Sequence, residues 1–495
     1  MPPLVQRDAT TLPPSEINAL LRLLRDELPA SVIPYAMDHR PLQPWRRTAL
    51  PLPQRTVLDS LRARCGDGAL DTWMAALLRA WLQDIGSGTA RKMRWVVPAT
   101  AVLGGDACAA LLGPHLRGEN HALRCTGDVG VSALVEIGTR GALLELAHLG
   151  RKFPQKFRGQ MAQQALQAIG DAQGISPEQL QDRILADGGL DAAGRRTFDY
   201  GPRQFEVLLD EYLAPILRTA DGCRLTSLPK PTTKDDAVRA AEARNDWKIA
   251  KTQIQQAARW LAARFEGAMI SGETWSVTGF NEYFRRHPLA RYVVRRLLWT
   301  SVSTDGRAAT CFRVAEDDTL ADSNDAPLEL SDGAMEVRPI HPMEMESGVR
   351  ETWQRLFAEY NIVGPFPQLD RPVFRLPAEY AAQKTVTSFP HSRFEVKALV
   401  FPLENRGWTR EEFANDGMVT HHLRRFPRAG VTACVEYTPG AFLGGLLSSG
   451  VQTLTQLTFF ASTGRPIPSA AMALGQVPPL VYSETLRDIH ALVPA

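Results

Sequence analysis

The sequence lacks the features that mark secreted, membrane-spanning or disulfide-bonded proteins. No apolar run approaches the ~18 residues that a membrane-spanning helix requires. The opening MPPLVQRDATTLPP has no apolar core of the kind that a secretory signal carries. The six cysteines lie far apart without a C-x-x-C pair, which favours free thiols over a disulfide framework or a zinc site. We therefore expect a cytoplasmic protein without a membrane partner.

An excess of charge of one sign is also missing. The 56 lysines and arginines nearly balance the 54 aspartates and glutamates, for a formal net charge of +2. Such a balance provides no global attraction to nucleic acid, so any basic patch must be local. The 44% hydrophobic and 22% charged fractions are ordinary for a globular protein. Because 495 residues exceed what one hydrophobic core usually holds, we expect several packed units.

The familiar catalytic motifs are absent as well. The sequence has no G-x-x-x-x-G-K-[ST], no H-E-x-x-H and no G-x-S-x-G between a predicted strand and helix. His421 and His422 share a predicted strand, so their rings point to opposite faces. His287 and His341 each precede a proline, which is typical of a helix entry or a strand exit. We therefore assign no catalytic residue, and we predict no metal site and no cofactor.

Residues 1–187 are predicted to be helical. Apolar positions recur at helical spacing in residues 15–28 and 68–85. A short glycine motif then recurs at residues 103–106, 137–140 and 169–171, at spacings of 34 and 32 residues. A helix-pair period of this size is typical of stacked, HEAT-like repeats. An irregular helical domain is the alternative.

Residues 188–364 are predicted to form a mixed module. Short apolar runs alternate with turns at Gly201-Pro202 and Asp221-Gly222, which indicates an antiparallel meander. An exposed connector and two helices follow, the second starting at Pro288 and continuing to Trp299. A β-hairpin around an acidic loop, from Glu316 to Asp332, completes the module.

Residues 365–495 are predicted to be rich in antiparallel strands. The strands are expected in FEVKALVFPL, GMVTHHLRRF, GVTACVEYTPG and TLTQLTFFAS, with one short helix in GWTREEF. The predicted fold class is therefore α+β. A helical array comes first, and antiparallel sheets packed on a few helices follow.

Residues 283–299 contain five arginines. On a helical wheel that starts at Leu289, Arg291 and Arg295 fall on a narrow solvent-facing strip, whereas Arg296 falls within the apolar face. A buried guanidinium without a partner is very costly. We expect Arg296 either to pair with a nearby carboxylate, Glu316 or Asp317, or to face a ligand.

The loop GPFPQLDRP is the second candidate site. Gln368, Asp370 and Arg371 could line a pocket with Arg313 and Glu316, since loops carry functional residues more often than cores do. Alternatively, they only satisfy backbone groups in a proline-fixed turn. The predicted ligand-binding residues are Arg296, Arg313, Glu316, Asp317, Gln368 and Arg371.

Five stretches together resemble a known bacterial family, the family of domain of unknown function 4132, which includes the molybdate metabolism regulator. The stretches are DYGPRQFEVLLDEYLAPILRTADGCRLTSLPKP, HPLARYVVRRLLW, FRVAEDDTLAD, GPFPQLDRP and YSETLRD. The resemblance covers residues 100 to 495, and it implies a helical-repeat region followed by a mixed α/β module. It implies no reaction and no catalytic residue. The chain departs from the family pattern at residues 272–275, where an arginine-rich stretch is usual.

Three functions remain open on this sequence. We expect first a binding or scaffold protein whose helical array docks a protein or peptide partner. The alternative is an enzyme that acts on a nucleotide-like or phosphorylated ligand in the α/β module. The third is a nucleic-acid-associated regulator that binds through Arg285, Arg286, Arg291 and Arg295, although the near-neutral charge counts against it.

Overall fold

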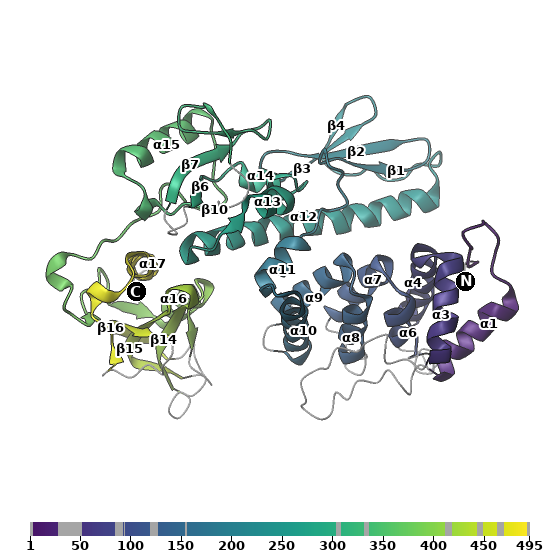
Figure 1. Cartoon of the computed structure of the whole chain (residues 1–495), viewed down its shortest axis with the longest axis horizontal. Helices are drawn as coiled ribbons and strands as arrows, with labels where there is room; N and C mark the ends of the chain where they lie inside the picture. The colour runs from purple at the N-terminus through teal and green to yellow at the C-terminus, as the bar shows by residue number, and fades with distance from the viewer. Residues whose placement is uncertain are drawn as a thin grey trace. The chain divides into compact units, whose positions relative to one another are not determined.

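The computed structural model divides the chain into two compact units, residues 1–186 and residues 187–495 (Figure 1). Helices fill the first unit, and helices with antiparallel sheets build the second. The α+β class is therefore confirmed, whereas the division at residue 364 stays a prediction. The structure describes residues 3–27, 52–84, 93, 95–118, 127–153, 156–302, 308–330, 336–410, 418–442, 449–462 and 470–492.

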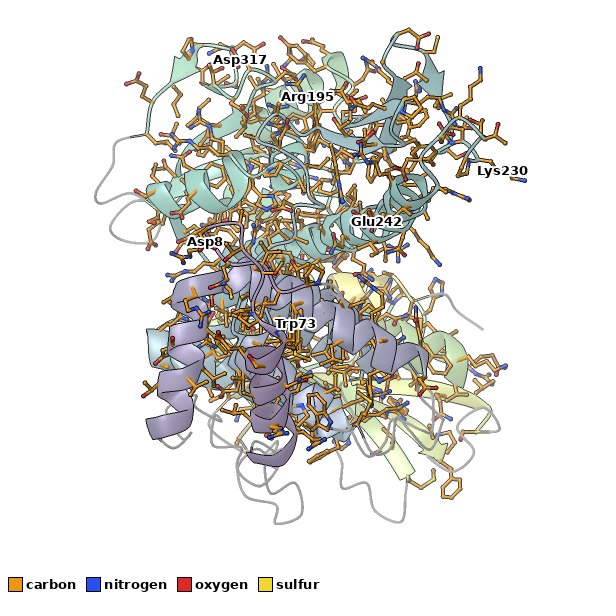
Figure 2. The ribbon with its side chains drawn as sticks, turned by 90° about the vertical axis from the view of Figure 1, so that its right-hand side faces the viewer. Asp8, Trp73, Arg195, Lys230, Glu242 and Asp317 are labelled. Carbon is orange, nitrogen blue, oxygen red and sulfur yellow. The ribbon has the colours of Figure 1, made fainter. Side chains whose placement is uncertain are left out.

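The first unit is a row of antiparallel helices, coloured purple to blue in Figure 1. Apolar side chains at helical spacing explain them: in α4, Trp73, Leu77 and Trp81 lie on one face and are buried. Figure 2 shows Trp73 among the helices of this unit. The helices are α1 (Pro14–Arg22), η1 (Leu23–Glu27), α3 (Leu52–Cys65), α4 (Asp67–Gln83), α6 (Val96–Leu103), α7 (Asp106–Leu116), α8 (Gly127–Ile137), α9 (Arg140–Lys152), α10 (Phe157–Gln173) and α11 (Pro177–Arg183).

Short glycine loops join the helices of this unit in pairs. Gly104 and Gly105 connect α6 to α7, and Gly138 connects α8 to α9, as two of the three predicted motif copies require. The third predicted copy is misplaced, because Gly170 lies inside α10. The loop follows instead at Gly174, whose φ of +66° ends the helix in the left-handed conformation that glycine adopts without strain.

Aspartates tie consecutive helix pairs together. The carboxylate of Asp71 in α4 accepts hydrogen bonds from the amides of Gly105 at 2.6 Å, Ala107 at 2.8 Å and Cys108 at 3.1 Å, at the start of α7. Asp106 in turn accepts one from the amide of Gly141 in α9 at 3.0 Å. Each carboxylate satisfies amides that a helix N-terminus leaves without an intrahelical partner.

The second unit opens with a four-stranded antiparallel meander in the order β1-β2-β3-β4. Its turns contain Gly201 and Gly222, so the predicted meander is confirmed. Its apolar face packs on the long helix α12 (Ala237–Ser271) through Phe205, Val207 and Ala243. Lys230 extends away from the ribbon of the intervening connector (Figure 2). The strands are β1 (Arg196–Asp199), β2 (Gln204–Leu209), β3 (Pro215–Thr219) and β4 (Arg224–Leu225).

Aromatic rings fill the core beneath α12. Phe265 contacts Trp275, Phe284 and Trp299 edge to face, at centroid distances of 5.0 to 5.8 Å. The short segments α13 (Val277–Phe280), η4 (Asn281–Arg285) and α14 (Ala290–Val294) wrap this cluster. The predicted helix from Pro288 to Trp299 is wrong, since α14 ends at Val294. Tight turns follow it, and Trp299 begins a fully buried strand.

A second antiparallel sheet has the order β5-β10-β6-β7-β8-β9. The predicted strands around the acidic loop are β7 and β10, yet β6 lies between them, so they do not form the expected hairpin. The acidic loop instead folds into its own meander of β8 and β9. The strands are β5 (Trp275–Ser276), β6 (Trp299–Val302), β7 (Ala308–Val314), β8 (Leu320–Ala321), β9 (Pro327–Leu328) and β10 (Glu336–Pro339).

The C-terminal sheet has the order β11-β16-β15-β14-β13, and β12 also pairs with β16. Two predictions here are wrong. FEVKALVFPL is mainly the helix α16 (Val396–Asn405), because Val396, Leu399, Val400 and Leu403 recur at helical spacing and are buried. GWTREEF begins as a turn and strand β13, and its last three residues lie outside the described residues. The strands are β11 (Thr385–Val386), β12 (Arg393–Glu395), β13 (Thr409–Arg410), β14 (Met418–Phe426), β15 (Val431–Phe442) and β16 (Val451–Ala461).

Candidate functional site

A pocket of about 500 Å³ lies between helix α15 (Ser347–Glu359) and residues 362–370. The helix ends because Asn361 adopts φ +54°, and the amide of Ile362 then donates to the carbonyl of Phe357 at 2.8 Å. This C-cap turns the chain back along the helix. Prolines 365 and 367 keep the returning segment extended. The lining includes apolar Phe357, Ile362, Pro365, Phe366 and Leu369.

Gln368 borders this pocket, but its amide is committed to the fold. Its side-chain nitrogen donates to the carbonyls of Leu298 at 2.8 Å and Ile340 at 2.9 Å, and its oxygen accepts from the amide of Leu298 at 2.9 Å. The side chain is buried. Gln368 therefore fixes the pocket loop to the start of β6 and the end of β10. The predicted contact of Gln368 with a ligand would have to break these hydrogen bonds.

Arg296 lines the same pocket. Its Nε donates to the carbonyl of Val363 at 2.7 Å, and its guanidinium lies 4.8 Å from the ring centroid of Tyr212. The side chain is half-buried, and burial lowers its pKa although the carboxylates of the neighbouring meander turn oppose that effect. The predicted pairing with Glu316 or Asp317 is wrong. Among the residues that the structure describes, no carboxylate forms an ion pair with Arg296.

The other polar groups of the pocket lie on α15 and at the end of the loop. Asp370 is exposed, and one of its oxygens accepts from the side-chain amide of Gln354 at 2.8 Å. The rim also exposes apolar surface, because Val363 is 59% exposed and Tyr212, under the Arg296 guanidinium, is 44% exposed. Within the described part of the chain, the pocket thus combines an apolar lining, a guanidinium without a carboxylate partner and one exposed carboxylate.

Arg313 lies elsewhere, in a closed network. Its guanidinium pairs with Asp325 at 2.8 Å and with Glu316 at 3.7 Å, and it covers the ring of Tyr360 at 4.6 Å. The Tyr360 hydroxyl donates to Asp325 at 2.7 Å. This hydrogen bond and Arg313 hold the pKa of Asp325 below its ordinary value. Asp317 only accepts hydrogen bonds within its own turn, from the amide and hydroxyl of Thr319, and Figure 2 shows it on a loop at the edge of its unit.

Arg371 is fully buried and fully paired. It binds Glu484 of helix α17 (Pro479–His490) through two hydrogen bonds of 2.6 and 2.7 Å, and Glu266 of α12 through one of 2.7 Å. His341 adds a contact of 3.1 Å to Glu484. Burial alone would raise the pKa of Glu484, but Arg371 and His341 hold it well below its ordinary value. Four segments far apart in sequence therefore meet at one closed cluster.

A second buried carboxylate extends this cluster. Asp488, one turn after Glu484 on α17, accepts from the indole of Trp408 at 2.8 Å and pairs with Arg424. Burial raises its pKa, against the opposing effects of Arg424 and Trp408. We call the residues Glu266, His341, Arg371, Arg424, Glu484 and Asp488 the buried charge cluster.

The six predicted site residues are therefore divided among separate places. Arg296 and Gln368 border the pocket, Arg313 pairs with Glu316, Asp317 closes a turn, and Arg371 is internal. Of the predicted grouping, Gln368 and Asp370 line the pocket together with Arg296, whereas Arg371, Arg313 and Glu316 lie outside its lining. Tyr212, which lies 84 residues before Arg296, left no signal in the sequence because only the fold brings the meander turn to the pocket.

The arginines in and around α14 are also engaged with the protein. Arg285 donates to the carbonyl of Asp318 at 2.9 Å, Arg295 pairs with the carboxylate of Asp318 at 3.0 Å, and Arg291 donates to the carbonyl of Ala192 at 2.9 Å. The prediction that Arg291 and Arg295 are solvent-exposed is wrong, since both are half-buried with these partners. Among the described residues, no group of three His, Cys, Asp or Glu could hold a metal ion, and no helix is long and apolar enough to cross a membrane.

The pocket and much of the buried charge cluster come from a segment with recognisable relatives. Residues 222–408 match the family model described as "Domain of unknown function (DUF4132)". The chain is also 29% identical, over 356 residues, to the uncharacterized protein YehI of Escherichia coli (strain K12). That match covers 71% of this chain but only 29% of the relative, so the chain spans under a third of its relative's length. No solved structure matches the chain.

Proposed function

We propose that this chain is a non-catalytic binding protein and that the pocket beside α15 receives an apolar side chain of a protein or peptide partner. The observation that carries the proposal is the pocket's composition. An apolar hollow of about 500 Å³ lies next to an arginine without a carboxylate partner among the described residues. Buried apolar pockets with aromatic and arginine residues at their edge are typical centres of protein interfaces.

The exposed rim favours a polypeptide over a small molecule. Val363 and Tyr212 present apolar surface outside the hollow, and a partner chain would cover both while one side chain fills the pocket. A small ligand would leave them in water. Apolar area removed from water contributes about 25 cal/mol per Å², so covering the rim adds to the affinity.

A small phosphorylated or nucleotide-like ligand is the second candidate. The pocket volume lies within the range of small-ligand sites, and Arg296 could bind a phosphate. The carboxylates of Asp210 and Glu211 act on Arg296 as well, and they would repel a dianion. This repulsion makes the polypeptide partner the better proposal. Arg371 and Arg313 are not available to such an anion, because each already pairs with carboxylates of the protein.

The helical array completes the proposal. We interpret its helix pairs as degenerate HEAT-like repeats, in a cytosolic protein of the molybdate metabolism regulator-like group. The aspartate links from α4 to α7 and from α7 to α9 support the repeats. The free thiols of the described cysteines support the cytosol. Stacked repeats commonly present extended surfaces for protein partners.

The test fills the pocket from its own wall. Ala358 lines the pocket and is exposed, so Ala358→Trp should block the hollow without disturbing the core. Val349 is exposed on the same helix nine residues earlier, half a turn around the helix, so Val349→Trp is the matched control. Peptides are selected from a displayed random library on the unaltered chain, and their affinities for all three proteins are then measured.

The expected result is a set of related peptides that lose at least tenfold in affinity for Ala358→Trp and bind Val349→Trp normally. Peptides that bind all three proteins equally would contradict the proposal. A phosphorylated small molecule that binds the unaltered chain but not Ala358→Trp, while no peptide binds, would also contradict it. This outcome would favour the enzyme.

A further inference from the structure

Three cations converge on one aromatic ring in the first unit, where α9 gives way to α10. The nitrogens of Lys152 and Lys156 lie 5.3 and 4.8 Å from the ring centroid of Phe153, and the guanidinium carbon of Arg158 lies 4.0 Å from it. Phe153 is buried, whereas both lysines are exposed and Arg158 is half-buried. All three positive charges therefore lie within 5.3 Å of the centre of one buried ring.

Only neutral groups hold these cations in place. Lys152 donates to the carbonyl of Arg117 at 3.1 Å, and Arg158 donates to the carbonyl of Gly118 at 3.3 Å, both just past the C-terminus of α7. The negative end of that helix attracts positive charge. None of the three cations forms an ion pair with a carboxylate in the part of the chain that the structure describes. Arg117 differs, because it pairs with Glu145.

Phe157, which follows Lys156 in the chain, adds exposed apolar area. Phe157 begins α10, and its side chain is 53% exposed. Such a surface carries two costs in water: the three cations repel one another, and the Phe157 ring, which stands between Lys156 and Arg158 in the chain, stays hydrated. Both costs disappear when an anionic group with an apolar neighbour covers the surface.

We propose that Lys152, Lys156, Phe157 and Arg158, here called the basic–aromatic surface, bind an acidic segment of a partner polypeptide that carries a bulky apolar residue beside its carboxylates. This site lies in the first unit and is independent of the pocket beside α15. The partner chemistry follows from charge complementarity and from the single exposed ring, which together match carboxylates and one apolar side chain.

The compactness of the surface favours a polypeptide over other polyanions. Nucleic acid binding gains affinity from cations distributed along many phosphates, whereas these charges meet at one point. Anchoring at an anionic membrane requires several apolar side chains on one face, whereas Phe157 is the exposed ring here. A short acidic stretch places two or three carboxylates within reach of all three cations.

The experiment uses the whole chain and a fluorescein-labelled peptide, Glu-Glu-Trp-Glu-Glu, with binding measured by fluorescence anisotropy. Lys156→Glu reverses one charge, and the acidic residue suits the N-cap position of α10, so the fold should persist. Arg79→Glu makes the same charge change on the exposed side of α4 and serves as the matched control. Phe157→Ala removes the ring alone.

We expect Lys156→Glu to weaken binding of the acidic peptide about tenfold, since it replaces an attraction by a repulsion. Arg79→Glu should leave binding within about twofold, because Arg79 lies on α4, apart from α10 (Figure 1), and salt screens the interaction between separated surface charges. Phe157→Ala should weaken the binding of this peptide, but it should not weaken the binding of a peptide with alanine in place of tryptophan. Binding should also fall as salt is added.

Several results would overturn the proposal. The neutral peptide Gln-Gln-Trp-Gln-Gln could bind as well as the acidic one, or both charge reversals could weaken binding equally. A single-stranded oligothymidylate, or vesicles containing phosphatidylserine, could bind more tightly than the peptide and lose that binding in Lys156→Glu. The last two results would identify nucleic acid or membrane as the occupant instead.

Discussion

The buried charge cluster and the pocket beside α15 hold an arginine in opposite ways. Arg371 is fully buried, and its guanidinium donates three hydrogen bonds to two carboxylates. Arg296 is half-buried against a neutral carbonyl and an aromatic ring. The first arrangement gives each guanidinium nitrogen a carboxylate partner inside the protein, whereas the second leaves guanidinium hydrogen-bonding capacity for another molecule. The two places therefore differ in whether a carboxylate of the described residues pairs with the arginine.

Arg371→Met should have the largest effect on stability. It removes the cation and leaves Glu484 and Glu266 without it, and breaking a buried pair in this way typically costs about 3–5 kcal/mol. Urea unfolding followed by tryptophan fluorescence measures the loss. Arg295→Met is the control, since its pair with Asp318 is partly exposed and should cost under ~1 kcal/mol. Similar losses in the two variants would contradict the distinction between a buried ion pair and a partly exposed one.

The cluster should also respond to acid. The folded pKa of Glu484 lies below its unfolded value of about 4.3. Its stabilisation is therefore fully present above that unfolded pKa and is lost as the pH falls toward the folded pKa. The difference in unfolding free energy between the unaltered chain and Glu484→Gln should shrink by about 1–2 kcal/mol between pH 7 and pH 3. A difference that stays constant over this range would show that the carboxylate is not held ionised.

Asp71→Ala should have an intermediate effect, confined to the first unit. The carboxylate satisfies three amides at the start of α7, and losing such a cap costs about 1–2 kcal/mol. Hydrogen exchange should accelerate at Gly105, Ala107 and Cys108. Asp106→Ala, which frees one amide, should cost less. Faster exchange throughout both units would argue against a local role for these links.

Arg296→Met should have the smallest effect on stability, under ~1 kcal/mol. It removes one hydrogen bond to a carbonyl at the surface and no ion pair with a described carboxylate. The same change should weaken the pocket-binding peptides severalfold. Unfolding and peptide affinity are measured on the same samples. A stability loss as large as that of Arg371→Met would place Arg296 among the structural residues.

Much of the fold could be predicted because it depends on local patterns. The meander, with turns at Gly201 and Gly222, and the helices of the first unit follow from alternation, periodicity and glycine placement. The errors occurred where a short apolar run suits either a helix or a strand. Residues 396–405 contain two valines among other apolar residues, which suit a strand. The i, i+3, i+4, i+7 spacing of Val396, Leu399, Val400 and Leu403 is the signal that indicates α16.

The candidate site was less predictable, because its partners come from distant segments. The loop containing Gln368 and Asp370 was identified from its composition, and the pocket there includes both residues. The predicted position of Arg296 is wrong because the helical wheel assumes a helix that continues to Trp299, whereas α14 ends at Val294. Arg371 was expected to face a ligand, whereas Glu484, 113 residues later, neutralises it inside the protein.

The sequence by itself determined most of the local elements, because these depend on residues close together in the chain. Its composition also determined the near-neutral net charge and the presence of arginines that need partners. Only the tertiary structure decided which of those arginines are satisfied. Each guanidinium takes the partners that the fold brings within hydrogen-bonding distance: Glu484 and Glu266 for Arg371, Asp325 for Arg313, and the neutral carbonyl of Val363 for Arg296. These contacts join distant segments, so no local pattern records them.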